Sequence, residues 1–109
     1  MNSKLDFFST NNDVANLLSA RVKNERIFQE LKQSELAEMA DVKLHVIRNF
    51  EQHSKISLDN LISIIRALKK LGIFEDMFDF EQERIDIDAF KYIDDAKKKA
   101  KKRVRDAKQ

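Results

Sequence analysis

The chain reads Leu31-Lys-Gln-Ser-Glu-Leu-Ala-Glu-Met-Ala-Asp-Val-Lys-Leu-His-Val-Ile-Arg-Asn-Phe-Glu51 in the stretch that says most about its architecture. Apolar residues recur there at spacings of three and four, which predicts a short helix over residues 33–40. The spacing breaks at Asp41-Val42 and resumes over residues 43–52, so two short helices meet at a tight turn. The apolar positions are Leu36, Ala37 and Ala40 in the first helix and Val46, Ile47 and Phe50 in the second.

Two further helices are predicted on either side of this pair. The upstream helix begins near Asn12 or Asp13, both of which are good N-caps. The downstream helix has Ser57 and Asp59 as candidate caps and ends near Gly72, a natural C-cap. The apolar faces are Val14, Leu17, Leu18 and Val22 upstream, Leu58, Leu61, Ile62, Ile65 and Leu68 downstream, and Phe74, Met77 and Phe78 in a closing helical turn.

Composition favours the same fold class. The chain has no proline and one glycine, and helix-forming residues dominate it, so we expect an all-α fold. The absence of cysteine excludes disulfides, thiol catalysis and thiolate metal sites. No apolar run is long enough for a membrane span and no signal-peptide pattern follows Met1, so we expect a cytoplasmic protein.

Charge is strongly segregated towards the C-terminus. Residues 74–95 contain 2 basic and 9 acidic residues, a net charge of −7, whereas residues 96–109 contain 8 basic and 1 acidic, a net charge of +7. Residues 84–88 alternate with period two, as a half-buried strand does, although Asp86 or Asp88 could equally cap a following helix. From Phe90 onward a helix with a weakly apolar seam is predicted. The seam consists of Ile93, Ala96, Ala100, Val104 and Ala107.

The stretch quoted above resembles the helix-turn-helix of the lambda-repressor-like family, which reads Leu-Ser/Thr-Gln-x-x-Leu-Ala-x-x-Ala-Gly-Val-Ser-x-x-x-Ile-x-x-x-Glu. The shared residues, in one ungapped register, are Leu31, Gln33, Leu36, Ala37, Ala40, Val42, Ile47 and Glu51. Residues 19–27 and 58–71 are similar to the first and fourth helices of phage repressors of this family. The resemblance implies a five-helix domain over residues 13–80, with an arm at 1–12 and a charged extension at 81–109.

A helix pair of this kind can lay its second helix in the major groove of DNA while the first crosses the backbone. With the apolar residues turned inward, the second helix presents side chains that can bond or pack against base edges. The predicted base-contacting residues are Lys43, Leu44, His45, Arg48 and Asn49. The predicted phosphate-contacting residues are Lys32, Gln33, Gln52 and Lys55, with Gln33 assigned by the resemblance. The resemblance also implies a structural ion pair between Arg26 and Glu51.

The family pattern is broken at two sites. Asp41 replaces the usual turn glycine, and His53 stands where a glycine commonly ends the second helix. Both positions favour a left-handed backbone, which these residues adopt at a higher cost than glycine does.

These features predict a transcriptional repressor that binds a pseudo-palindromic DNA operator as a homodimer, with half-sites about 10 base pairs apart or a multiple of that. The alternative is a HipB-like antitoxin, which represses its own operon and binds a HipA-like kinase toxin. The small domain, the charged extension and the possible strand at residues 84–88, which could pair across a dimer, are similar to such proteins. In either case we expect a bacterial protein that is associated with the nucleoid when bound to DNA. Two histidines eight residues apart do not suggest a metal site, and no carboxylate pair lies in an evident pocket. We expect neither a cofactor nor enzymatic activity.

The basic tail at residues 97–108 has two competing interpretations. Its positive charges predict sequence-independent attraction to DNA phosphates. Alternatively, the tail neutralises the acidic segment at residues 74–95 or binds a partner protein.

Overall fold

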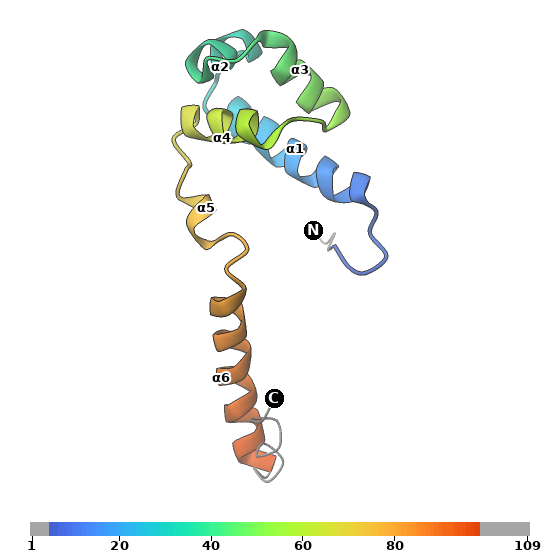
Figure 1. Ribbon diagram of the computed structural model, residues 1–109, viewed down its shortest axis with the longest axis vertical. Coiled ribbons are helices and arrows are strands. Elements are labelled where there is room, and N and C mark those ends of the chain that lie inside the picture. The colour runs from blue at the N-terminus through green and yellow to red at the C-terminus, as the bar shows by residue number, and fades with distance from the viewer. Residues whose placement is uncertain (1–4, 99–109) are drawn as a thin grey trace. The chain divides into compact units, whose positions relative to one another are not determined.

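The computed structural model describes residues 5–98, and every regular element in this range is a helix (Figure 1). The all-α expectation is therefore confirmed for these residues. The chain divides into two compact units, residues 1–73 and residues 74–109. The helices are α1 Asn11–Phe28, α2 Gln33–Ala40, α3 Leu44–His53, α4 Leu58–Ala67, α5 Ile73–Asp76 and α6 Phe80–Lys98.

Helix α1 begins earlier than the sequence suggested, because its N-cap is Thr10 and not Asn12 or Asp13. The Thr10 hydroxyl accepts a hydrogen bond from the amide of Asp13 at 3.0 Å, and the Asp13 carboxylate accepts one from the amide of Thr10 at 2.9 Å. This reciprocal pair satisfies two amides that the helix start would otherwise leave without partners. Asp13 therefore serves the cap from inside the helix.

The predicted pair of short helices is confirmed by α2 and α3, which follow each other around a tight turn at residues 41–43 (Figure 1). Helix α2 has the predicted bounds, and the Glu35 carboxylate accepts a hydrogen bond from the amide of Lys32 at 2.7 Å just before it. Helix α3 begins at Leu44 because Lys43 is its extended N-cap. The turn is short enough to hold the two helices in direct contact.

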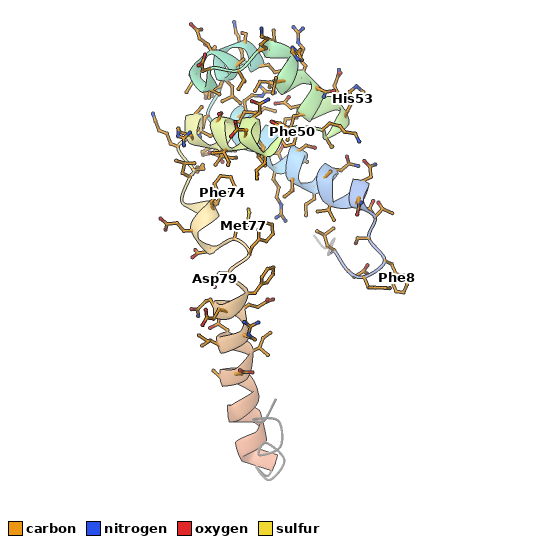
Figure 2. All side chains as sticks on the ribbon, in the orientation of Figure 1. Phe8, Phe50, His53, Phe74, Met77 and Asp79 are labelled. Atoms are coloured by element: carbon orange, nitrogen blue, oxygen red, sulfur yellow. The ribbon has the colours of Figure 1, made fainter. Side chains whose placement is uncertain are left out.

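The core of the first unit lies among α2, α3 and α4, with α1 packed against α3. Phe50, labelled in Figure 2, projects from α3 into this core and is 3% exposed. On α1 the predicted apolar face is only partly covered, since Leu17 and Val22 are half-buried while Val14 and Leu18 are exposed. The buried apolar residues are Leu36, Ala37, Ala40, Ile47, Phe50, Ile64, Ile65 and Leu68.

Helix α4 confirms one predicted cap and contradicts another. The Ser57 hydroxyl accepts a hydrogen bond from the amide of Asn60 at 3.1 Å, as expected of an N-cap. The helix ends at Ala67, however, and the left-handed residue beyond it is Lys69, with φ of 62°, so the prediction of Gly72 as C-cap was wrong. The amide of Lys70 donates to the carbonyl of Ile65 at 3.0 Å, which closes the helix while Leu68 is still in the core.

Helix α5 is a single turn that begins at Ile73, the last residue of the first unit, and α6 of the second unit is a 19-residue helix. Neither alternative for residues 84–88, a half-buried strand or a helix cap at Asp86 or Asp88, is observed, because these residues lie within α6. A cap ahead of them favours the helix, since the Asp79 carboxylate accepts a hydrogen bond from the amide of Gln82 at 3.0 Å. The Gln82 amide group also reaches the Asp86 carboxylate one turn on, at 3.1 Å.

Helix α6 therefore starts at Phe80, ahead of the helix predicted from Phe90. The predicted seam residues from Ala100 onward lie outside the described residues. Within residues 5–98, none of the helices combines the length and the apolar character that a membrane crossing requires.

The core makes a direct prediction about two apolar residues of α4. Ile64 is 1% exposed, whereas Leu58, which the sequence placed on the core face, is 67% exposed. We expect Ile64→Ala to lower the free energy of unfolding by about 2 to 5 kcal/mol, because it leaves a cavity. Leu58→Ala serves as the control and should change it by no more than about 0.5 kcal/mol. Urea unfolding measures both, and similar losses in the two variants would contradict this packing.

Candidate nucleic-acid interface

The outer face of α3 carries the side chains predicted to contact bases. His45, Arg48 and Asn49 are exposed on the helix, and Lys43 is exposed at its N-cap. Leu44 is half-buried. Because Ile47 and Phe50 take the inner face, the polar side chains share a surface that the core does not use.

An ion pair between α1 and α3 holds this helix in place. The Arg26 guanidinium donates from Nε to Glu51 Oε2 at 2.7 Å and from Nη2 to Glu51 Oε1 at 3.0 Å. Its Nη1 donates to the carbonyl of Leu31 at 2.7 Å. The two paired side chains are only 11% and 5% exposed. The structure thus brings together the two residues that the resemblance paired, in a two-pronged geometry that fixes their relative orientation.

Gln33 adds α2 to the same network. Its Nε2 donates to Glu51 Oε1 at 2.8 Å. Burial raises the pKa of Glu51, but hydrogen bonds from Arg26 and Gln33 and the positive charges of Arg26 and Lys23 outweigh it, so the pKa lies below the usual 4.5. An amide nitrogen has two hydrogens, so Gln33 keeps one donor that is not used by Glu51. Gln33 is half-buried, so part of its side chain is still accessible to a partner.

The other three residues predicted to contact phosphate are exposed. Lys32 precedes α2, Gln52 lies in the last turn of α3, and Lys55 follows α3. Asn49 Nδ2 lies 3.5 Å from the carbonyl of Lys55, which is at the outer limit of a hydrogen bond. Such a contact leaves the Asn49 side chain available for stronger partners.

The turn between α2 and α3 has the left-handed backbone that the sequence predicted. Asp41 has φ of 58° and ψ of 45°, and the next amide, that of Val42, donates to the carbonyl of Ala37 at 3.0 Å. A residue other than glycine or asparagine in this conformation costs of order 1 kcal/mol, which aspartate reduces by its short polar side chain. The turn keeps its shape without the glycine of the family pattern.

At the other end of α3, the prediction of a left-handed His53 was wrong. His53 is still helical and exposed at the end of α3 (Figure 2), and the left-handed residue is Ser54, with φ of 60°. Ser54 Oγ donates to Asn16 Oδ1 at 2.6 Å and lies 2.8 Å from Ser19 Oγ. Ser19 is 5% exposed. These hydrogen bonds tie the C-terminus of α3 to the first half of α1.

Sequence reasoning missed this polar contact. Asn16 and Ser19 lie 38 and 35 residues from Ser54, and no local pattern links them. Serine at a helix end is common for purely local reasons, so the sequence held no signal for this contact.

Residues suited to other chemistry are not gathered together. Among the side chains that the structure describes, those of residues 5–89, no three His, Cys, Asp or Glu residues are grouped so that they could hold a metal ion. The carboxylates of Glu81, Glu83, Asp86 and Asp88 are exposed along α6. No protein-family model matches the chain, and no curated protein matches it.

Removing one partner of the ion pair tests its structural role. We expect Arg26→Ala to lower the free energy of unfolding by about 3 to 5 kcal/mol, because the Glu51 carboxylate is left buried without its cation. Arg21→Ala is the matched control, since Arg21 is exposed on the same helix and its loss should cost no more than about 0.5 kcal/mol. An unchanged melting temperature for Arg26→Ala would refute the role.

The lowered pKa of Glu51 makes a prediction about acid stability. The unfolded chain takes up a proton near pH 4.5 and the folded chain only at lower pH, so the pair stabilises the fold above that pH and loses its effect as pH falls. We expect the free energy of unfolding to fall more steeply below about pH 5 in the wild type than in Glu51→Gln. The two pH profiles share every other carboxylate, so parallel curves would contradict the assignment.

Proposed function

We propose that this protein is a sequence-specific, double-stranded DNA-binding transcriptional repressor that acts as a homodimer on a palindromic operator. One observation carries the proposal. Helix α3 follows α2 after a three-residue turn, is fixed from behind by the core and by Glu51, and presents exposed Lys43, His45, Arg48 and Asn49 on its free face.

The chemistry of this face suits base edges in the major groove. Asparagine bonds adenine through both of its amide atoms, arginine and lysine bond guanine, and histidine can donate or accept at a purine edge. Leu44 is half-buried at the start of α3 and can pack against a thymine methyl with its uncovered part. A helix of ten residues is long enough to present these groups to a few successive base pairs.

Phosphate contacts would fix the orientation of the helix pair on the duplex. Lys32 and Gln33 lie at the N-terminus of α2, where backbone amides and the helix dipole also favour an anion. Gln52 and Lys55 lie at the far end of α3. Gln33 contacts Glu51 in the last turn of α3, so Gln33, Gln52 and Lys55 lie towards the same end of the base-reading face, where contacts to phosphates would fix the orientation of the helix.

We propose dimeric binding because one helix of this size makes too few base contacts for a strong site. Two copies bound to half-sites about 10 base pairs apart, or a multiple of that, would place both recognition helices on one face of the duplex. Membership of the lambda-repressor-like family, and action on the nucleoid in a bacterial cytoplasm, are parts of the same proposal and rest on the sequence motif.

We do not extend the proposal to a HipB-like antitoxin. One of the features that suggested this alternative, a possible strand at residues 84–88 that could pair across a dimer, is not observed, because these residues are helical. Co-purification with a HipA-like kinase toxin would be the observation that favours it.

Two residues of α3 test the base-reading face. His45 and Asn49 are one turn apart and both exposed, so they can reach neighbouring bases together. After selection of a preferred DNA site from a random pool, we expect His45→Ala and Asn49→Ala each to weaken binding to that site by about 1 to 3 kcal/mol. Binding to unrelated DNA should change little, because that binding depends on phosphate contacts.

Asn24→Ala is the matched control, since Asn24 is an exposed asparagine on α1 and outside the proposed interface. Circular dichroism checks that each variant is folded. Equal affinity of the wild type and the His45/Asn49 double variant for the selected site would contradict the assignment of these two residues as base contacts.

A further inference from the structure

One edge of α1 is hydrogen-bonded to the C-terminal end of α3. Ser54, which directly follows α3, donates from Oγ to Asn16 Oδ1 at 2.6 Å. This distance is usual for an O–H···O hydrogen bond and short for an N–H···O one, so the amide oxygen of Asn16 faces Ser54. Ser19 Oγ lies 2.8 Å from Ser54 Oγ and donates to it, because the single hydroxyl hydrogen of Ser54 is already used.

This chain of hydrogen bonds fixes the orientation of the Asn16 amide. Because Ser54 holds its oxygen, the amide nitrogen and its two hydrogens lie on the side away from Ser54. Asn16 is exposed, so these hydrogens are accessible to a partner outside the chain. Such a partner must be a hydrogen-bond acceptor.

Lys23 extends the same edge two turns further along α1. Seven residues correspond to a rotation of about 700°, so Asn16 and Lys23 share a face and lie about 10 Å apart along the helix axis. Lys23 is exposed, and its positive charge helps to lower the pKa of Glu51, in agreement with a position on the α3 side of α1. The edge therefore presents an amide donor and an ammonium group beside the end of α3.

The edge also lacks acidic residues. No acid occupies this face of α1, which by helical spacing comprises positions 12, 16, 19, 20, 23 and 27. Asp13, on the neighbouring face, is turned to the start of the helix, where its carboxylate accepts from the amide of Thr10. A surface with donors and a cation but no anion suits phosphate oxygens.

The position of the edge agrees with this chemistry. In the proposed complex Gln52 and Lys55 contact phosphate, and Ser54 lies between them in the chain. Because Asn16 is bonded to Ser54, the edge of α1 borders the same part of the proposed interface.

We propose that Asn16 and Lys23 form a phosphate-binding edge on α1, with Ser54 as the positioning residue that orients the Asn16 amide. This edge rests on the proposed function and adds a third helix to a DNA contact assigned above to α2 and α3. Contacts to phosphate carry no base information, so its loss weakens binding to the selected site and to unrelated DNA alike.

Two cations of α1 form a matched test of the edge. Lys23→Gln and Arg21→Gln each remove one exposed positive charge, but two residues correspond to a rotation of about 200°, so Arg21 lies on the other side of α1. Each cation that contacts phosphate contributes about 0.9 to the steepness of log affinity against log salt concentration. We expect Lys23→Gln to reduce this slope by about 0.9 on both kinds of DNA, and Arg21→Gln to leave it unchanged. Equal slopes in the two variants would overturn the role of Lys23.

A second pair of variants tests Asn16. Asn16→Asp keeps the shape of the side chain and an oxygen for Ser54, but it replaces the amide nitrogen by a carboxylate oxygen. We expect it to weaken binding to both kinds of DNA at least about tenfold, because a donor is lost and a negative charge faces phosphate. Asn11→Asp adds the same charge about 140° away around α1 and should weaken binding no more than about twofold. Circular dichroism checks folding, and equal effects of the two substitutions would contradict the contact.

A double-mutant cycle tests the positioning role of Ser54. Ser54→Gly removes the hydroxyl but keeps the left-handed backbone, with φ of 60°, which glycine adopts readily. We expect Asn16→Ala to weaken binding to unrelated DNA about fivefold in the natural chain and less than about twofold in the Ser54→Gly chain. Equal losses in the two chains would show that Ser54 does not act through Asn16.

Failure of the α1 edge is distinguishable from failure of the proposed function. A wild type that binds its selected site through His45 and Asn49, but is indifferent to the substitutions at Asn16 and Lys23, would overturn the edge alone. A wild type that binds no DNA would overturn both.

Discussion

The Glu51 carboxylate is the point at which three helices of the first unit are joined. It receives two hydrogen bonds from Arg26 of α1 and one from Gln33 of α2, while it belongs to α3. Because the pair is almost fully shielded from water, its charges attract more strongly than on a surface, and either one alone would be costly. The orientation of α3, and of the face it exposes, follows from this one contact and from the core beneath it.

Tight turns without glycine are a second constraint on this unit. Glu30, Asp41, Ser54 and Lys69 all have a left-handed backbone, with φ between 58° and 62°, and the one glycine of the chain is at none of these positions. Each such turn costs of order 1 kcal/mol when an L-residue occupies it. Core packing offsets this cost, because the turns bring the apolar faces of short helices into contact within a few residues. The fold therefore depends on core burial to hold turns that the local sequence does not favour.

These constraints hold the buried side of α3 in place and leave the proposed base-reading face exposed to solvent. Ile47 and Phe50 hold the middle of α3, and Ser54 ties its end to α1. A helix held at its middle and at its end can present His45 and Asn49 without itself having to reorganise. Such preorganisation lowers the entropy lost on binding, which is what a small module with few contacts needs. The second unit differs from the first, because the side chains described along α6, at residues 80–89, are all exposed.

Local patterns in the sequence were sufficient for α2, the turn at Asp41, α3 and the Ser57 cap, because periodicity, caps and turn residues act within a few positions of one another. They failed where a distant contact or a competing local one prevailed. Helix α4 ends before Gly72, at a left-handed Lys69 that directly follows the buried Leu68. The Thr10 and Asp13 pair moves the start of α1, and the Asp79 cap favours helix over strand at residues 84–88. The Ser54 contacts join residues 35 and 38 positions apart, and nothing in the sequence near Ser54 encodes them. Several caps, helix ends and conformations have similar free energies when only neighbouring residues are considered. Packing and hydrogen bonding between distant residues decide among them, so the outcome can be observed only in the tertiary structure.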